Sequence, residues 1–197
     1  KALVQSIALT QETNFHCNCV NFGIEKADAA DEFPLLYVDG LYTKTCYVYR
    51  ITGDRGSYLL TKVQTITYPS AWGNPEMFID RDANTMWVLD GQTNNVTFKR
   101  MAIPALSAGD VTLSADNVLD EVNIGATPVI QSGSIFNGDL YFGAGYTGEG
   151  MVYVIDLYVE KRIVTKINYG YEPQTPLIWN GNLYVLMSAG LDLLYLT

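Results

Sequence analysis

His16 is the single histidine in the sequence, and Asn18 follows two positions later in a segment that reads as a β-strand. Side chains two positions apart on a strand lie on the same face, so these two groups would act together. Because histidine titrates near neutral pH, His16 is a candidate general base or ligand contact. The alternative is a hydrogen-bonded histidine that stabilises the packing of an inner strand.

Cys17 and Cys19 flank Asn18, and Cys46 is the third cysteine of the chain. Adjacent strand residues point to opposite faces, and no second cysteine or histidine cluster completes a set of four tetrahedral ligands. We therefore predict no metal site and no cofactor. An odd cysteine count leaves at least one thiol outside any internal disulfide, and a bridge between Cys17 and Cys19 would be strained. We expect buried free thiols.

Carboxylates are the other candidates for chemistry, because glycoside hydrolysis normally needs two of them flanking the scissile bond. Glu76 and Asp80 lie on one face of a predicted inner strand, about 13 Å apart at the usual strand rise. That separation is long for a catalytic pair, so Glu76 would need a partner such as Asp39 or Glu172. Asp80 fits better in the turn that follows the strand.

An internal repeat supplies the elements that would position these residues. An aromatic strand residue recurs about every fifty residues, and in two copies it follows an Asn-Gly pair between apolar runs. Asn-Gly is the strongest short signal of a β-hairpin, because both residues of a type I′ turn need a positive φ. The aromatic positions are Tyr37, Trp87, Tyr141 and Tyr184, and the turns are Asn137-Gly138 and Asn180-Gly181.

Each repeat unit reads as four strands, which predicts an all-β chain folded as a single four-bladed β-propeller. The last unit lacks its fourth strand, and a matching segment, at about residues 2–9, stands near the N-terminus instead. We expect this strand to complete the C-terminal blade and to close the ring without an open sheet edge. The competing architecture is a β-sandwich. The chain 1–197 is then one domain, with blades at about 14–69, 73–124, 127–170, and 174–197 plus 1–10.

In such a ring we expect the ligand at the loops that lead into the innermost strands and at the loops between second and third strands. These loops mix aromatic side chains with amides and carboxylates, which suits a sugar because rings stack on its faces and polar groups bind its hydroxyls. The alternative is that the aromatic rings only cap the blades. The predicted ligand-binding residues are His16, Asn18, Tyr42, Trp72, Asn74, Glu76, Tyr146, Tyr171 and Gln174.

The blade pattern resembles that of bacterial β-propeller repeat proteins over almost the whole chain. The stretch from His16 to Phe22, followed by Glu32 to Val38, is similar to the H-x-N-x-x-x-F blades of bacterial surface and phage-associated propellers. In architecture the chain is similar to the hemopexin-type four-bladed ring, without that family's sequence hallmarks. The resemblance implies a binding role outside the cytoplasm, in the periplasm, on the cell surface or after secretion, with the export leader absent from this chain.

The composition narrows the class of protein further. Of the 197 residues, 48% are hydrophobic and 17% are charged, which excludes a disordered chain. The formal net charge of −9 repels phosphate backbones, so we expect no nucleic-acid partner. No apolar run approaches the roughly 20 residues that span a bilayer, so we expect no transmembrane segment.

The sequence therefore favours a non-enzymatic module that binds a glycan or a protein partner on the loop face or in the central channel. The first alternative is a glycoside hydrolase or lyase with its carboxylates at the channel mouth. The second is a structural scaffold without a small-molecule site. No pattern in the sequence indicates an oligomeric state.

Overall fold

The computed structural model describes residues 5–7, 17–40, 43–91, 93–146, 148–168, 171–179, 182–187 and 194–196. Within these ranges the chain is all-β, as predicted, and it contains no α-helix. Two short 3₁₀ turns, η1 (Leu106–Ala108) and η2 (Ala115–Asn117), are its helical pieces. Neither is long and apolar enough to cross a membrane.

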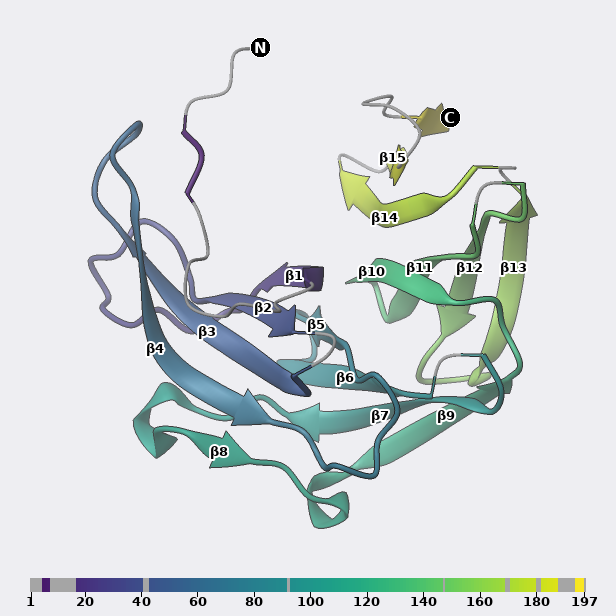
Figure 1. The fold of residues 1–197 in the computed structure, drawn as a ribbon, viewed down its shortest axis with the longest axis horizontal. Helices are drawn as coiled ribbons and strands as arrows, with labels where there is room; N and C mark the ends of the chain where they lie inside the picture. The colour runs from purple at the N-terminus through teal and green to yellow at the C-terminus, as the bar shows by residue number, and fades with distance from the viewer. Residues whose placement is uncertain are drawn as a thin grey trace.

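The strands form four sheets that follow one another along the chain (Figure 1). Within each sheet, strands that are consecutive in sequence pair antiparallel, which is the pattern of hairpin connections. Sheet 1 contains β1 (Cys17–Phe22), β2 (Leu36–Gly40), β3 (Thr45–Thr52) and β4 (Leu59–Thr67); sheet 2 contains β5 (Met77–Asp80), β6 (Thr85–Asp90), β7 (Val96–Ala102) and β9 (Asp120–Gly125). Sheet 3 contains β10 (Ile130–Phe136), β11 (Asp139–Ala144), β12 (Met151–Asp156) and β13 (Arg162–Asn168); sheet 4 contains β14 (Pro173–Trp179), β15 (Asn182–Met187) and β16 (Leu194–Leu196).

The turn chemistry explains why the chain reverses where the sequence predicts. Asn137 and Gly138 join β10 to β11 with φ values of 52° and 82°, so both residues adopt the positive φ of a type I′ turn. Asn84, between β5 and β6, also has a positive φ, of 51°. The second predicted Asn-Gly turn, Asn180-Gly181, lies outside the described residues.

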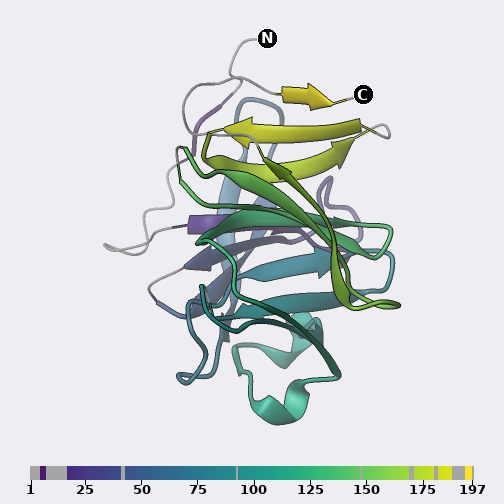
Figure 2. The same cartoon turned by 90° about the vertical axis from the view of Figure 1, so that its right-hand side faces the viewer.

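The sheets are arranged in a propeller-like manner around a shared centre (Figure 1). The first strand of each sheet is the innermost: β1 contacts β5 and β10, and β10 also contacts β5 and β14. Figure 2 shows sheet 4, in yellow, lying across sheet 3, in green, which agrees with the contacts of β14 with both β10 and β11. The first strands therefore lie side by side at the centre, where a ligand-binding channel mouth was predicted.

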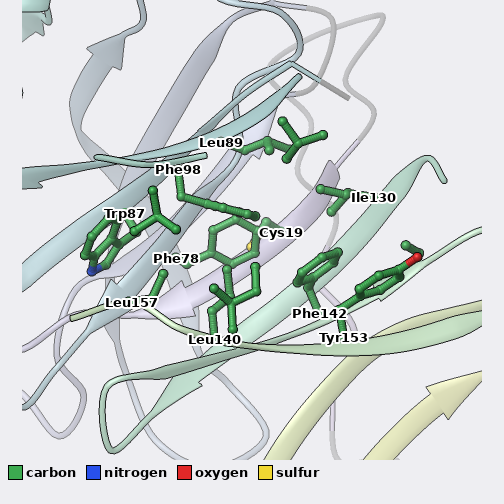
Figure 3. Close-up of a cluster of buried hydrophobic side chains, with 14 residues drawn as sticks. Cys19, Phe78, Trp87, Leu89, Phe98, Ile130, Leu140, Phe142, Tyr153 and Leu157 are labelled. Atoms are coloured by element: carbon green, nitrogen blue, oxygen red, sulfur yellow. The ribbon is translucent and has the colours of Figure 1, made fainter. Parts of the chain in front are cut away.

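The core consists of side chains packed between neighbouring sheets. One cluster joins sheets 2 and 3 through a run of rings, in which Phe98 lies 5.9 Å from Phe78 and 5.8 Å from Phe142 between ring centres (Figure 3). Tyr153 stacks on Phe142 at 5.0 Å. A second cluster, including Tyr37 and Met77, joins sheets 1 and 2. Burying each such ring contributes about 1.5–3 kcal/mol, so the sheets are held face to face by aromatic packing.

The connection between β7 and β9 leaves sheet 2 and reaches the outer edge of sheet 1. Its two-residue strand β8 (Val111–Thr112) pairs parallel with β4, at Ile66 and Thr67. The Gln64 side chain donates from Nε2 to the carbonyls of Ala105, at 3.0 Å, and Gly109, at 2.7 Å. This connection therefore ties sheets 1 and 2 together, a feature that the repeat did not predict.

The predicted N-terminal closing strand lies mostly outside the described residues. Residues 5–7 are described and belong to no strand. The Gln5 side chain donates to the Tyr58 carbonyl and accepts from the Tyr58 N–H, both at 2.7 Å, which places Gln5 beside the β3–β4 loop of sheet 1. Closure by this segment stays a prediction.

Candidate functional site

The top face, as we call it, is the end of the sheets at which β1, β5, β10 and β14 begin and β2, β6, β11 and β15 end. Near this face Asn18, on β1, donates from Nδ2 to Glu76 Oε1 at 3.0 Å. Glu76 directly precedes β5, so this bond links sheets 1 and 2 across their innermost strands. Two predicted site residues from segments 58 residues apart in sequence are thereby in contact.

A second buried carboxyl, Asp39 at the top of β2, lies beside this pair. Its Oδ1 accepts a hydrogen bond from the Tyr68 hydroxyl, and its Oδ2 accepts from the Met77 N–H at 2.8 Å. Asp39 is 1% exposed and Glu76 is 0% exposed. Because Met77 directly follows Glu76, the structure brings together the two carboxyls that the sequence suggested as partners. Asp80, in contrast, lies at the other end of β5 and accepts from the Tyr158 hydroxyl at 2.6 Å.

Burial governs the protonation of both carboxyls. It raises the pKa of Asp39 to about 7, although hydrogen bonds from Tyr68, Met77 and Cys46 act in the opposite direction. Burial also raises the pKa of Glu76 well above its usual range; the Asn18 bond opposes that rise and the neighbouring Asp39 charge adds to it. Glu76 therefore keeps its proton to a higher pH than an exposed glutamate does, and in the protonated form it can donate a hydrogen bond.

One carboxyl oxygen of Glu76 forms no hydrogen bond among the described residues. This oxygen, Oε2, is buried. Buried polar atoms are nearly always paired, and leaving one unpaired costs about 1–3 kcal/mol. A ligand group that forms a hydrogen bond with Glu76 Oε2 would therefore remove this free-energy cost, which makes the Glu76–Asn18 pair a candidate binding point on the top face.

The three thiols are free, as expected, and they line the same region. Cys19 Sγ lies 3.0 Å from the Met77 carbonyl oxygen, to which Asn21 Nδ2 also donates at 2.8 Å. Burial raises the pKa of Cys17 to about 12, so its thiolate form is negligible at neutral pH. No group of three metal-ligating side chains occurs among the described residues. The local chemistry is that of packed, protonated thiols.

Trp72 and Asn74 lie in the β4–β5 loop, and the ring of Trp72 is buried. Trp72 is 6% exposed and packs in the core between sheets 1 and 2, with the Lys99 ammonium 5.6 Å from its ring centre. Asn74 is half-buried and has a positive φ of 42°, which fits its place in a tight loop. The side chain of Trp72 therefore stabilises the loop from beneath.

Tyr146 and Tyr171, in contrast, project from the top face, and each is 55% exposed. Their loops touch, because a Cβ added to Gly150, at the end of the Tyr146 loop, would clash with the Tyr171 carbonyl oxygen. Beside them Gln174 donates from Nε2 to Glu172 Oε1 at 2.8 Å. Three predicted site residues, two rings and an amide, thus share the sheet 3–sheet 4 side of the top face.

The remaining two predicted site residues, His16 and Tyr42, lie outside the described residues. Tyr68 is the residue that sequence reasoning missed. The available signal was the alternation of Gln64, Ile66 and Tyr68, which places all three on the inward face of one strand end.

No protein-family model matches this sequence, and no curated protein matches it in sequence. Solved structures do resemble its fold. The glutaminyl cyclase of Myxococcus xanthus, which is propeller-like, aligns with a TM-score of 0.51 at 14% identity, over 85% of this chain and 68% of that one. The computationally designed protein Ika4 gives 0.48 at 13% identity over 96% of both chains, and the WD40 β-propeller domain of Doa1 gives 0.46 at 9% identity over 91% and 64%. The likeness concerns the fold alone.

Proposed function

We propose that this chain is a non-enzymatic, four-bladed β-propeller that binds carbohydrate on its top face. The observation that carries the proposal is the pair Tyr146 and Tyr171, two tyrosines that stay largely exposed on touching loops. Ten aromatic side chains among the described residues are buried, and Tyr146 and Tyr171 are the most exposed rings there, so this pair on one face is a candidate contact surface.

The neighbouring polar groups match the needs of a sugar. A sugar ring presents apolar C–H faces and hydroxyls that both donate and accept hydrogen bonds. Tyr146 and Tyr171 supply the flat apolar surfaces, and the hydrogen-bonded pair Gln174–Glu172 supplies donors and acceptors beside them. Towards the centre, Asn18 and the buried carboxyl of Glu76, whose Oε2 has no partner among the described residues, are further polar groups of the top face.

The ring proposal rests on the strand count. Among the described residues, sheets 2 and 3 have four strands each, sheet 1 has four consecutive strands plus β8 at its outer edge, and sheet 4 has three. We propose that the N-terminal segment supplies a fourth strand beside β16, which would cover the edge of sheet 4, from residues other than 5–7, which belong to no strand and lie by Tyr58 of sheet 1. We also propose an extracytoplasmic location, supported by the similarity of the repeat to extracytoplasmic propellers.

A glycan array followed by titration tests the proposal. The unmodified protein should retain at least one glycan class, and Tyr146→Ala and Tyr171→Ala should each weaken it about tenfold, the expected loss of one stacked ring. Phe136→Ala is the matched control, because Phe136 is 40% exposed at the β10–β11 turn on the other face. Retention of a protein partner instead of a glycan, lost in the same two variants, would assign the surface to protein recognition. No retention at all would favour the scaffold alternative.

An enzyme is the second candidate, and the buried pair Glu76–Asp39 is the observation that favours it. Glu76 has the raised pKa of a general acid, and glycosidases pair such an acid with a carboxylate. However, both oxygens of Asp39 already accept hydrogen bonds, from Tyr68 and Met77, which leaves it poorly placed to attack or to activate water. Bound glycans that stay intact after long incubation would fit binding; cleavage that Glu76→Gln abolishes while binding persists would assign the enzyme.

A further inference from the structure

A pocket of about 280 Å³ opens where sheets 1 and 2 meet on the bottom face, which is formed by the loops between first and second strands and between third and fourth strands. It is therefore separate from the sugar-binding surface proposed above. Its lining combines apolar side chains with three oxygen-bearing ones. The lining residues are Ile24, Glu25, Tyr37, Asn84, Ile103 and Ala105.

Tyr37, on β2, is the deepest part of this pocket. It is 1% exposed, and of the six lining residues it alone is buried. Its hydroxyl has no hydrogen-bond partner in the described part of the chain. The ring is held in place by Gly23, where an added Cβ would come within 2.6 Å of the ring atom Cε2. A buried, unpartnered hydroxyl is unfavourable in the free protein and is relieved by a bound polar group.

The carboxylate of Glu25 lies near the Tyr37 hydroxyl. Its Oε2 accepts from the Leu106 N–H at 3.1 Å, and its carbonyl accepts from the Leu35 N–H at 2.8 Å, so the residue is fixed at both ends. Burial raises the pKa of Tyr37, with smaller contributions from Cys46 and from the Glu25 carboxylate. The carboxylate is thus close enough to act on the hydroxyl, although no hydrogen bond joins them.

The acidic side chain and the hydrogen-bond acceptors of this pocket favour a cationic ligand. Glu25 and Tyr37 are its only ionisable lining residues, and the adjacent Lys26 ammonium binds the Asp31 carbonyl at 2.7 Å. The chain as a whole carries a formal charge of −9, which attracts cations. A carboxylate, a hydroxyl and the Asn84 amide oxygen are acceptors, and an ammonium group offers three donors and no acceptor.

We propose that this pocket binds a small organic ammonium compound. The ammonium group donates to Glu25 and Tyr37, and a short hydrocarbon body packs on Ile24, Ile103 and Ala105. The volume lies at the lower end of the roughly 300–1,000 Å³ range of ligand pockets, so the body is about the size of one ring or a four-carbon chain.

Nuclear magnetic resonance of the full chain, followed at the methyl groups of Ile24, Ile103 and Ala105, tests the proposal. The probes are benzylammonium and n-butylammonium, with benzyl alcohol and butyrate as neutral and anionic counterparts. The two ammonium ions should shift these methyl signals to saturation, and the counterparts should bind at least tenfold more weakly. Equal binding of a counterpart, or no saturable shift with either ammonium ion, overturns the proposal. A lysine-containing peptide that binds more tightly than both ions would support ammonium recognition with a protein chain as the source.

Variants locate the contacts. Glu25→Gln keeps an acceptor for the Leu106 N–H and removes the charge, so ammonium binding should weaken about tenfold or more. Glu121→Gln, an exposed carboxylate on the outer strand β9, should leave binding unchanged. Equal losses in the two variants would contradict a specific role for Glu25.

Tyr37→Phe supplies a second, independent readout. Because the hydroxyl is unpartnered in the free protein, its removal should raise the melting temperature by about 2–4 °C while it abolishes ammonium binding. Tyr158→Phe is the matched control: its hydroxyl donates to Asp80 at 2.6 Å and accepts from Trp87 at 3.2 Å, so its loss should lower the melting temperature. A Tyr37→Phe protein that melts lower and still binds ammonium overturns the proposal.

Discussion

At the scale of single residues, the polar groups that lie deepest in the molecule also join its sheets. Asp39 from sheet 1 accepts hydrogen bonds from Tyr68 and from the first backbone N–H of β5, and Glu76 accepts from Asn18 of β1. Taking a carboxylate out of water costs several kcal/mol, and these bonds offset only part of that cost. Protonation offsets the rest, which makes the stability of the fold depend on pH.

The first prediction concerns that dependence. The pKa of Asp39 is about 7 in the folded chain and 3.8 when unperturbed, so the folded state holds this proton to a higher pH. Its stabilising contribution is complete below about pH 4 and is lost as the pH rises through 7. Urea unfolding at intervals from pH 5 to 8 should show a falling free energy of unfolding, at most about 1.4 kcal/mol per pH unit for one proton.

Asp39→Asn should make this fall less steep, leaving the part that the raised pKa of Glu76 contributes, whereas Asp54→Asn, in the exposed β3–β4 loop, should retain the full slope. A flat profile in the unmodified protein, or an unchanged slope in Asp39→Asn, would contradict the assignment of the proton to Asp39.

Sequence reasoning identified part of this cluster. Asn18 and Glu76 were recognisable because each stands at the start of an inner strand, which is a local pattern. The contact of Asp39 with Tyr68 joins residues 29 positions apart and depends on how β2 and β4 meet β5 in space. Periodicity along one strand carries no information about such a contact. It likewise gave no sign that Trp72 would turn inward while Tyr146 stays exposed.

At the scale of elements, turns formed by neighbouring residues can be predicted from the sequence, whereas pairings between distant segments cannot. The hairpin at Asn137-Gly138 follows from two residues that accept a positive φ, so the sequence predicted it. Strand β8 has only two residues and pairs with β4 of sheet 1. No run of alternating apolar and polar residues in the sequence predicts it. Such connections depend on the finished packing of sheets 1 and 2.

The second prediction concerns Gln64, which anchors that connection by two hydrogen bonds from its Nε2. Gln64→Ala should lower the free energy of unfolding by about 1–3 kcal/mol, because the carbonyls of Ala105 and Gly109 lose their donor. It should also speed hydrogen exchange at the Leu113 N–H, which donates to the Thr67 carbonyl at 2.8 Å. Gln131→Ala, in sheet 3, is the control and should leave exchange at Leu113 unchanged. Unaltered exchange in Gln64→Ala would show that the connection is held by other contacts.

The third prediction concerns Gly150, where a side chain has no space. A Cβ there would clash with the Tyr171 carbonyl oxygen, so Gly150→Ala must push the two top-face loops apart. We expect a loss of about 1–3 kcal/mol in urea unfolding, together with weaker glycan binding. Gly73→Ala is the control, because a Cβ there would meet its nearest neighbour at an ordinary 3.4 Å. Equal stability of the two variants would contradict the close approach of these loops.

At the scale of the whole molecule, sheets follow one another around a centre, and the faces between them are filled by apolar side chains, aromatic rings among them. The repeat in the sequence predicted this sheet order because each unit carries its own turns and alternation. Closure of the ring is our proposal, because it depends on contacts between the two ends of the chain, which a repeat does not determine. The fourth sheet, with three described strands, is where such closure would add a strand.

The fourth prediction tests closure through removal of residues 1–10. If this segment completes sheet 4, its removal should lower the melting temperature and speed hydrogen exchange most at Leu194–Leu196. Gln5→Ala is the control, because it removes only the side-chain contacts with Tyr58 in sheet 1. A truncated protein that behaves like Gln5→Ala would contradict closure by an N-terminal strand.

The central claim is that the top face binds carbohydrate through its exposed tyrosine pair. Its most direct test is the dissociation constant of the glycan selected by the array, measured for Tyr171→Ala and for Phe136→Ala against the unmodified protein. We expect Tyr171→Ala to bind this glycan about tenfold more weakly than the unmodified protein, and Phe136→Ala to bind it equally well. Equal affinity of all three proteins for the glycan, or no glycan bound by the unmodified protein, would contradict it.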